Sequence, residues 1–319
     1  MITAELRRAI GAAAGHPDAD PQLRPGPQPG SYSSSLPFRL ARDPRRYAQT
    51  LAARLAAEPW IDKAEVTGPG YLTVTVTRDA LAGLAVRIAR AGPACAASDA
   101  LHGHTAPGPV ADLTAAPDWP SARAALAAEV TGRLAATAGA TVTFDLERSV
   151  VPPPVPASPV AVAVAYAGID AVRFALARMP PGGVPPQSAI IARHVLVNPA
   201  YAVRYAHAAS AAVLRWSAAL GTEPGGFRPR LLMAPRELAL LDALSWLPER
   251  VAMAARRGRP DDFAGYLEEL AARTIDTMST TGFTMISSIS SERLWLAAAA
   301  RTGLAAGLGL LGVGAPERI

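Results

Sequence analysis

One stretch of the chain brings ring and guanidinium side chains together at helical spacing. Residues 196–215 read LVNPAYAVRYAHAASAAVLR, and Asn198 followed by Pro199 suits a helix start. At about 100° per residue, three side chains fall in one narrow stripe and two tyrosines in the next: Arg204, His207 and Arg215, then Tyr201 and Tyr205. Because rings stack on bases and guanidinium groups contact phosphates, the pattern predicts an RNA-binding surface. A core-facing tyrosine pair with solvated arginines is the alternative.

A second candidate group lies on a short alternating segment. Gly68-Pro69-Gly70 forms a turn, and residues 71–77 alternate with the period of two that is typical of a strand. One face of this strand carries Tyr71, Thr73, Thr75 and Thr77, and the other carries Leu72, Val74 and Val76. The ring of Tyr71 could stack on a base.

The elements around this strand form a small module. Asp43 is suited to cap a helix that Pro44 begins, and apolar residues recur every fourth position after it. The Pro, Gly and Ser content of residues 15–36 predicts an extended surface segment. Residues 1–95 are therefore expected to form an N-terminal α/β module.

The middle of the chain has the pattern of a short β-α-β unit. The sequence PSARAALAAEVTGRLAATAGA favours a helix, and the strand-like pieces PVADLTA and ATVTFDL flank it, followed by the Pro-rich linker VVPPPVPASP. Residues 96–165 are therefore expected to be one truncated unit. From residue 166 to 319, Leu, Ala and Val recur at spacings of three and four, which predicts an all-helical bundle and an α+β chain overall.

Bulk composition limits the classes of partner and compartment. The chain of 319 residues has a formal net charge of +5, with a single lysine, Lys63, so a polyanionic partner is favoured. A single cysteine, Cys95, excludes an internal disulfide and a thiolate metal cluster. No segment has the length and apolar content of a membrane span, and the first residues are too weakly apolar for a secretory signal. We expect a cytoplasmic protein without a membrane partner.

Motifs at both ends of the chain resemble one family of enzymes. GIDAVRFALAR, VNPAYAVRYAHAA, YLEELA and the terminal GLGLLGVGAPERI are similar to the DALR-type anticodon-binding domain of arginyl-tRNA synthetases. YSSSLPFRLARDPRRYAQTLAARL and IDKAEVTGPGYLTVTVT resemble the N-terminal additional domain of the same family. The resemblance implies a tRNA partner, a Rossmann-type core remnant in the middle segment, and a structural salt bridge between Asp170 and Arg173.

The signatures that this family uses for amino-acid activation are missing. A class I synthetase holds ATP with an HxGH motif and a KMSK loop, but His102 and His104 are two positions apart and Lys63 lies in the N-terminal module. We expect the two histidines to be solvated loop residues. The segment 96–165 is also too short for a complete doubly wound sheet. The sequence therefore predicts a pseudoenzyme, and it assigns no catalytic residue, cofactor or metal ligand.

Several base-reading positions of the family are altered. In the family, the aromatic residue after Gly-Pro-Gly and an Asn two positions later contact the tRNA D-loop, and Thr73 replaces that Asn here. Ala209 replaces the Arg of the usual YAHAR, and Ile319 replaces a terminal Met. Stacking is expected to persist while base readout weakens. The predicted RNA-binding residues are Tyr71, Thr73, Asn198, Tyr201, Arg204, Tyr205, His207, Arg215 and Ile319.

Three functions remain open from the sequence. The first is a non-catalytic paralogue that binds tRNA. The second is an enzyme, an arginine-tRNA ligase or a tRNA-dependent transferase completed by a partner protein. The third is a protein-interaction subunit whose helical bundle binds a protein partner, such as a synthetase or transferase.

Overall fold

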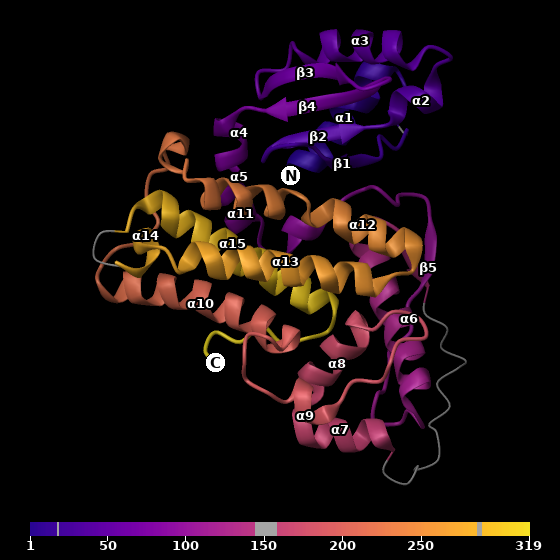
Figure 1. Cartoon of the computed structure of the whole chain (residues 1–319), viewed down its shortest axis with the longest axis vertical. Helices are drawn as coiled ribbons and strands as arrows, with labels where there is room; N and C mark the ends of the chain where they lie inside the picture. Colours follow the sequence, from indigo (N-terminus) through magenta and orange to yellow (C-terminus); the bar gives the residue numbers. More distant parts are fainter. Residues whose placement is uncertain (18, 144–157, 286–288) are drawn as a thin grey trace.

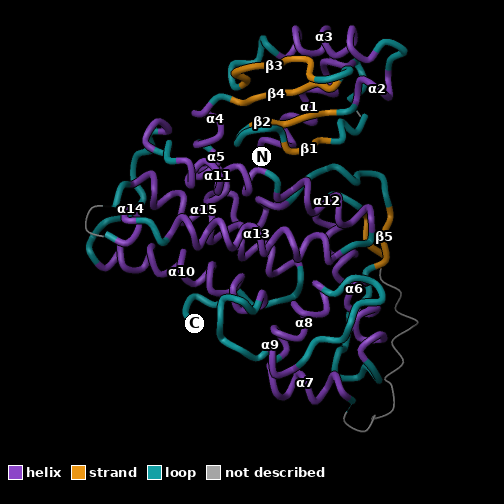
Figure 2. Tube along the Cα trace, viewed as in Figure 1, coloured by secondary structure: helices purple, strands orange, loops and turns teal. Residues whose placement is uncertain are grey.

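The computed structural model describes residues 1–17, 19–143, 158–285 and 289–319. Figure 1 shows a small sheet domain above layers of helices, with the C-terminus on the opposite side of those layers from the sheet. Among the described residues, strands occur only in the N-terminal module and in one short pair beside α6, as the colouring of Figure 2 makes clear. The chain is mixed α/β with a C-terminal helical region, as the sequence predicts.

A four-stranded antiparallel sheet forms the N-terminal module. The strands run β1 (Leu23–Pro25), β2 (Ser31–Ser34), β3 (Ile61–Thr67) and β4 (Tyr71–Val76), and their order in the sheet is β1-β2-β4-β3. The helices of the module are α1 (Ile2–Ala14), α2 (Leu36–Leu40) and α3 (Pro44–Leu55). The apolar side chains of β4 are buried, as expected, but Thr73 on the other face is buried as well. The carboxylate of Asp43 accepts a hydrogen bond from the Arg46 amide and caps α3, also as expected.

The expectation of an extended surface segment at residues 15–36 is only partly right. The segment contains β1 and β2, and the side chain of Tyr32 in β2 is fully buried. Its hydroxyl donates to Ser245 Oγ at 2.7 Å, and its ring packs on Trp246 with centroids 5.1 Å apart. The Gly and Pro residues therefore form a tight β1–β2 loop in which residues 27–29 are exposed, as expected, while Gly30 and Tyr32 are buried against the bundle.

The middle of the chain forms a parallel β-α-β unit. β5 (Thr105–Pro107) pairs in parallel with β6 (Thr141–Thr143), and α6 (Trp119–Thr137) connects them. The first strand lies before PVADLTA, so the strand expected within that sequence was wrong. The Ala111 amide donates to the buried Glu129 carboxylate, and Asp112 accepts from the Thr114 and Ala115 amides, so this backbone turns instead of pairing. Most of the predicted Pro-rich linker falls outside the described residues.

Helices dominate the rest of the described chain. Short helices α4 (Arg78–Ala82), α5 (Leu84–Ala91) and η1 (Gly92–Ala96) precede the β-α-β unit. After residue 158 the helices are α7 (Pro159–Ala167), α8 (Ile169–Arg178), α9 (Ser188–Ile191), α10 (Pro199–Ala219), η3 (Pro229–Leu231), α11 (Pro235–Ser245), α12 (Leu247–Arg257), α13 (Pro260–Met278), α14 (Thr281–Thr284) and α15 (Ser291–Leu310). Residues 235–257 form two helices, α11 and α12, because Pro248 lacks the amide hydrogen that one continuous helix would require. Among the described residues, no helix is long and apolar enough to cross a membrane.

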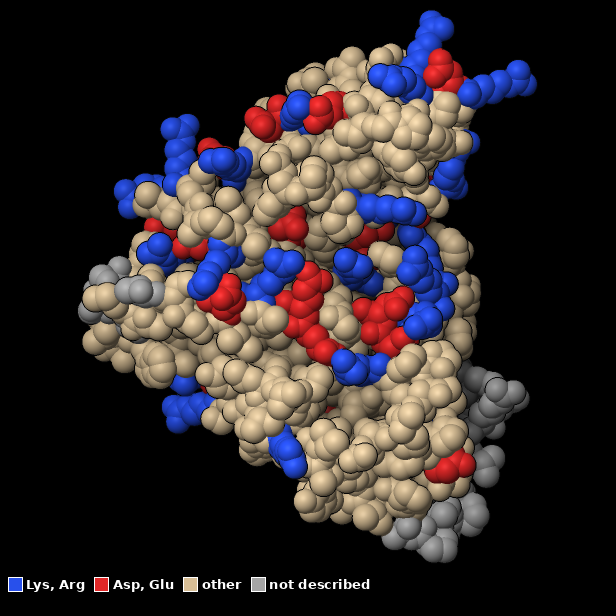
Figure 3. Space-filling view, in the orientation of Figure 1, with Lys and Arg blue, Asp and Glu red and all other residues tan. Residues whose placement is uncertain are grey.

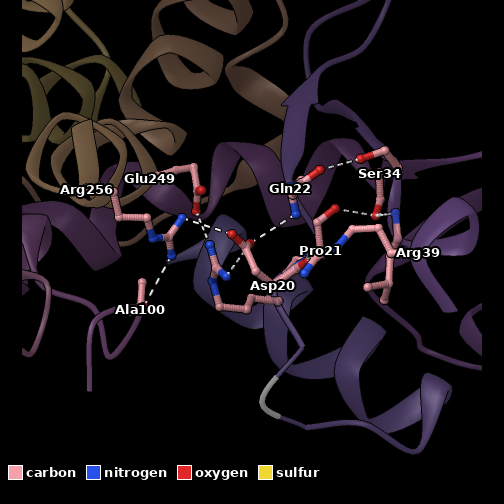
Figure 4. A network of polar contacts seen from close by, with 11 residues as sticks. Asp20, Pro21, Gln22, Ser34, Arg39, Ala100, Glu249 and Arg256 are labelled. Atoms are coloured by element: carbon pink, nitrogen blue, oxygen red, sulfur yellow. Dashed lines mark hydrogen bonds and ion pairs between the residues drawn. The ribbon is translucent and has the colours of Figure 1, made fainter. Parts of the chain in front are cut away.

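The N-terminal module docks directly on α11 and α12 of the bundle. Arg7 of α1 reaches both Glu249 of α12 and Asp20, each at 2.7 Å. Figure 4 shows Asp20 between the two domains, with Arg256 on the bundle side also directed at it. Further along the chain, α5 and η1 pack on α15. The division of the chain at residues 95 and 165 stays a prediction.

Candidate nucleic-acid interface

The C-terminal tail is fastened along α10. His207 Nδ1 lies 2.9 Å from the Pro316 carbonyl oxygen, and Arg215 donates to the Glu317 carbonyl at 2.6 Å. The Glu317 carboxylate pairs with Arg301 of α15. Burial lowers the pKa of His207, an effect opposed by its hydrogen bond to Pro316, so the neutral ring is favoured. The tail is thus a fixed part of the surface.

A cleft of about 590 Å³ opens where α10, α13, α14 and this tail meet. Three predicted residues line it together: Tyr205, Arg215 and Ile319. Trp216 also lines it and is 57% exposed, which is unusual for so large an apolar ring. The cleft therefore joins two accessible rings with a guanidinium group, the combination that stacks bases and contacts phosphates.

Sequence inspection missed Trp216, although a signal for it exists. Trp216 follows Tyr205 by 11 positions, which is about three helical turns, so the two rings share a face of α10. On α10, Tyr201 stacks on Tyr205 with ring centroids 5.8 Å apart, and His194, in the loop before the helix, stacks on Tyr201 with centroids 5.5 Å apart. A line of rings runs along α10 into the cleft.

The remaining predicted residues of α10 are held inside the protein. Asn198 occupies the N-cap position of α10, but its side chain accepts no capping hydrogen bond from the helix. Its side-chain amide instead donates to the Ile191 and Arg193 carbonyls at 2.8 and 2.7 Å. Asn198 and His207 are both buried. Their side chains fix the helix and the tail, and a direct contact of either with RNA stays a prediction.

Arg204 belongs to a junction that differs from the expected one. Asp170 and Arg173 do not pair with each other. Asp170 lies 3.5 Å from Arg204 and accepts from the Gly314 amide, whereas Arg173 pairs with the buried Glu129 at 2.5 Å. Residues three apart on a helix can pair, but both side chains here find partners on other elements. The expected salt bridge between Asp170 and Arg173 was therefore wrong, and the two side chains instead link α8 to α6, to α10 and to the C-terminal tail.

A second aromatic site lies on the N-terminal module. Tyr71 and Phe38 are 37% and 41% exposed, and their ring centroids lie 4.8 Å apart. The turn before Tyr71 rests on the start of α3, because a Cβ on Gly70 would lie 2.8 Å from Pro44 Cβ. Thr73 is 5% exposed and its hydroxyl lies 2.8 Å from that of Thr67, so its side chain is held within the sheet.

Three arginines with no carboxylate partner among the described residues lie in α3 or just before it, and the start of α3 contacts the Gly70 turn. Arg42, Arg45 and Arg46 are exposed, and none forms an ion pair with a described residue. The broad face over α11–α13 is different: Figure 3 shows blue and red side chains interspersed there. Pairs such as Arg236–Asp276 and Arg273–Glu269 account for this mixture. These three guanidinium groups thus add positive charge without a paired carboxylate to the region of the Gly70 turn, in contrast to the mixed charges over α11–α13.

The histidines of the LHGHT segment and the cysteine lie outside both aromatic sites. His102 and His104 are exposed loop residues, as expected. Cys95 is buried, and burial raises the pKa of its thiol to about 12. The described part of the chain has no cluster of three or more His, Cys, Asp or Glu side chains that could hold a metal ion.

Comparison with known families matches both ends of the chain. The family described as "DALR anticodon binding domain" matches residues 203–319, and that described as "Arginyl tRNA synthetase N terminal domain" matches residues 1–76. The first range contains the cleft, and the second contains the Phe38–Tyr71 pair. Phe38 lies outside the motifs that sequence inspection weighed for RNA contact.

Curated relatives are longer than this chain. An arginine-tRNA ligase of Clavibacter sepedonicus is 39% identical over 158 residues, covering 48% of this chain and 28% of that protein. One of Renibacterium salmoninarum is 38% identical over 162 residues, covering 48% and 29%. The matched part of the chain thus covers less than a third of the length of these relatives. The solved Thermus thermophilus arginyl-tRNA synthetase superposes with a TM-score of 0.73 at 15% identity over 100% of each chain, which shows the fold.

Proposed function

We infer that this chain, an arginyl-tRNA synthetase-related protein that joins the N-terminal and DALR anticodon-binding domains of that family, binds tRNA without activating an amino acid. The observation that carries the proposal is the cleft at the end of α10, where Tyr205, Trp216 and Arg215 meet the C-terminal residue. The cleft lies inside the matched anticodon-binding domain. The Phe38–Tyr71 pair supplies a second point of contact.

The kind of binding follows from the side chains present. Rings and guanidinium groups supply stacking and phosphate contacts, which depend little on base identity. The amide and guanidinium that read bases in the family are replaced by Thr73 and Ala209. We therefore propose broad tRNA binding that weakens steeply as salt rises.

The absence of activation is proposed from the middle of the chain. The described residues there form one parallel pair of strands beside α6, where a class I synthetase holds ATP on a full sheet. The sequence also lacks the HxGH and KMSK signatures. The test is arginine-dependent exchange of pyrophosphate into ATP by the purified chain. Exchange above a no-enzyme background would support the alternative of an arginine-tRNA ligase.

Filter-binding titrations test RNA recognition. Several tRNA species are titrated at two or more salt concentrations with the wild type and with Trp216→Ala, Tyr205→Ala and Tyr71→Ala. If bases stack on these rings, each change should cost about 1–3 kcal/mol. Tyr166→Ala is the matched control, because Tyr166 is 67% exposed on α7, outside both aromatic sites.

Each outcome has a distinct meaning. Losses at the three rings but not at Tyr166 support the proposal. Strong preference for arginine tRNAs would show that base readout survives without the two altered side chains. No binding by the wild type at low salt would refute the tRNA proposal.

A protein partner is the second candidate, and one observation favours it. An apolar groove of about 430 Å³ lies beside α8 and α9, and Val184 and Ile190 of its lining are 88% and 49% exposed. Exposed apolar side chains around a groove are typical of protein contact sites. Crosslinking in the native cell, followed by sequencing of RNA and mass spectrometry of protein, distinguishes the two candidates.

A further inference from the structure

Helix α7 is apolar on every side, yet part of it is open to solvent. Its sequence, PVAVAVAYA, contains no charged residue. Val160 and Ala163 are fully buried. Val162 and Tyr166, by contrast, are 56% and 67% exposed. A helix that is hydrophobic all round is normally buried on all sides. The exposed side of α7 is therefore left uncovered by the part of the chain that the structure describes.

Two apolar grooves continue this surface. α7 packs on α9, and the groove of about 430 Å³ beside α8 and α9 is lined by Val184 and Ile190. Pro199, at the start of α10, lines both this groove and a neighbouring one of about 520 Å³. Leu196 and Val197, 51% and 86% exposed, line the second groove. We call the exposed side chains of this surface the apolar face: Val162, Tyr166, Val184, Ile190, Leu196 and Val197.

Charge is absent from the segments that build the apolar face. Residues 158–169, 179–192 and 195–203 contain no Asp, Glu, Lys or Arg, although 18% of the whole chain is charged. Figure 3 shows the same contrast, because blue and red side chains gather over α11–α13 and are sparse over α7–α9. A partner selected by charge would need charges to pair with, and these segments supply none. Recognition at this face therefore depends on apolar contact and shape.

The size of the apolar face is that of a stable interface. The exposed fractions of its six side chains amount to roughly 700 Å², which is close to the roughly 800 Å² that each partner buries in a standard protein interface. The largest apolar patch on a typical monomer covers only about 300–600 Å². The face thus has the area that one half of a dimer interface requires.

We propose that the apolar face is the contact between two copies of this chain. In a twofold dimer both copies use the same patch, so a charge near the axis would approach a like charge. The uncharged segments of this face avoid that repulsion. The face also provides its own complement in shape, since the exposed ridge of α7 lies beside the groove that α9 lines. The ridge of one copy enters the groove of the other, and burial of the six side chains drives association.

The test is sedimentation velocity, with light scattering for mass, over a wide range of micromolar concentrations. The full chain is purified free of nucleic acid, so that RNA cannot bridge two copies. The mass should be twice the 33.0 kDa of one chain at high concentration and should fall toward 33.0 kDa on dilution.

Two variants locate the interface. Val184 and Val197 are 88% and 86% exposed, so Val184→Glu and Val197→Glu should leave the fold intact, which thermal unfolding checks. Each should raise the dissociation constant of the dimer at least about tenfold, because an unpaired charge would be buried opposite its own copy. Leu220→Glu is the matched control and should change nothing. Leu220 is 60% exposed and follows the 21 residues of α10, about 30 Å from Pro199.

A chain that stays monomeric at every concentration would overturn the proposal, and so would a dimer that neither glutamate variant weakens. The inference does not depend on RNA binding, because none of the six residues lines the cleft or belongs to the Phe38–Tyr71 pair. A dimer that binds no tRNA would refute the function proposed above and support this interface, whereas a monomer that binds tRNA would do the reverse.

Discussion

Replacing Arg7 by methionine tests the docking of the N-terminal module on the bundle. The Arg7 and Glu249 side chains are 12% and 7% exposed, and the described residues give Glu249 no other cation. Removing one partner of a buried ion pair costs about 3–5 kcal/mol, because the other charge is left desolvated and unpaired. The residual exposure of this pair indicates the lower end, about 3 kcal/mol. Asp20 keeps Arg256 at 3.0 Å and adds little to the cost.

The assay is urea unfolding of wild type and variant, followed by both far-ultraviolet circular dichroism and tryptophan fluorescence. Arg8→Met is the matched control, since Arg8 is the next residue on α1, is exposed, and carries the same charge. It should change the free energy of unfolding by less than about 0.5 kcal/mol. The double variant Arg7→Met with Glu249→Gln should recover part of the loss, because no charge then remains buried.

Equal stability of the Arg7 and Arg8 variants would refute the reasoning, since it would mean that Glu249 is not desolvated by the docking. A double variant less stable than Arg7→Met alone would also contradict it. Loss of coincidence between the two optical probes in Arg7→Met would show that the domains unfold separately once the pair is gone.

Three further outcomes are expected. Burial lowers the pKa of His207, so the folded state favours the neutral ring. The stability that this preference gives is complete above the unfolded pKa of about 6.5 and is lost as the pH falls from there through the folded pKa. The urea midpoints at pH 7.5 and 5.5 should therefore differ less in His207→Gln than in the wild type. Cys95, buried and with its thiol pKa raised to about 12, should react with a thiol reagent at neutral pH only after unfolding, and rapid labelling of the native chain would contradict its placement. Thr73→Val should cost about 1 kcal/mol, from the lost contact with Thr67, yet leave tRNA affinity unchanged; a clear loss of affinity would mean that the hydroxyl reaches RNA.

Local patterns in the sequence predicted those parts of the fold that local physics decides. The capped start of α3 and the strand β4 with its buried apolar face depend on neighbouring residues, and the structure confirms both. The β1–β2 segment was misjudged, because Tyr32 is buried by packing on Trp246, which lies far away in the chain. No periodicity in residues 15–36 encodes that contact.

In the candidate site, too, local spacing predicted some contacts and could not predict those made by distant parts of the chain. The helical period placed Tyr201 and Tyr205 side by side, and it could also have found Trp216. It could not show that His207 and Arg215 are engaged by the tail, because that depends on where the last residues of the chain fold back.

The docking of the two domains has a consequence for the RNA binding proposed above. Thr3 donates to the Ser245 carbonyl and Tyr32 to the Ser245 hydroxyl, so the Phe38–Tyr71 pair and the α10 cleft belong to one fixed frame, with the helical layers between them (Figure 1). This frame fixes the distance between the two aromatic sites. Under the proposed function, an RNA whose folded shape matches this distance would engage the second site at a high effective concentration once the first is bound, and an RNA of another shape would gain nothing from it. Discrimination can then come from distance, even where the individual contacts are blind to base identity.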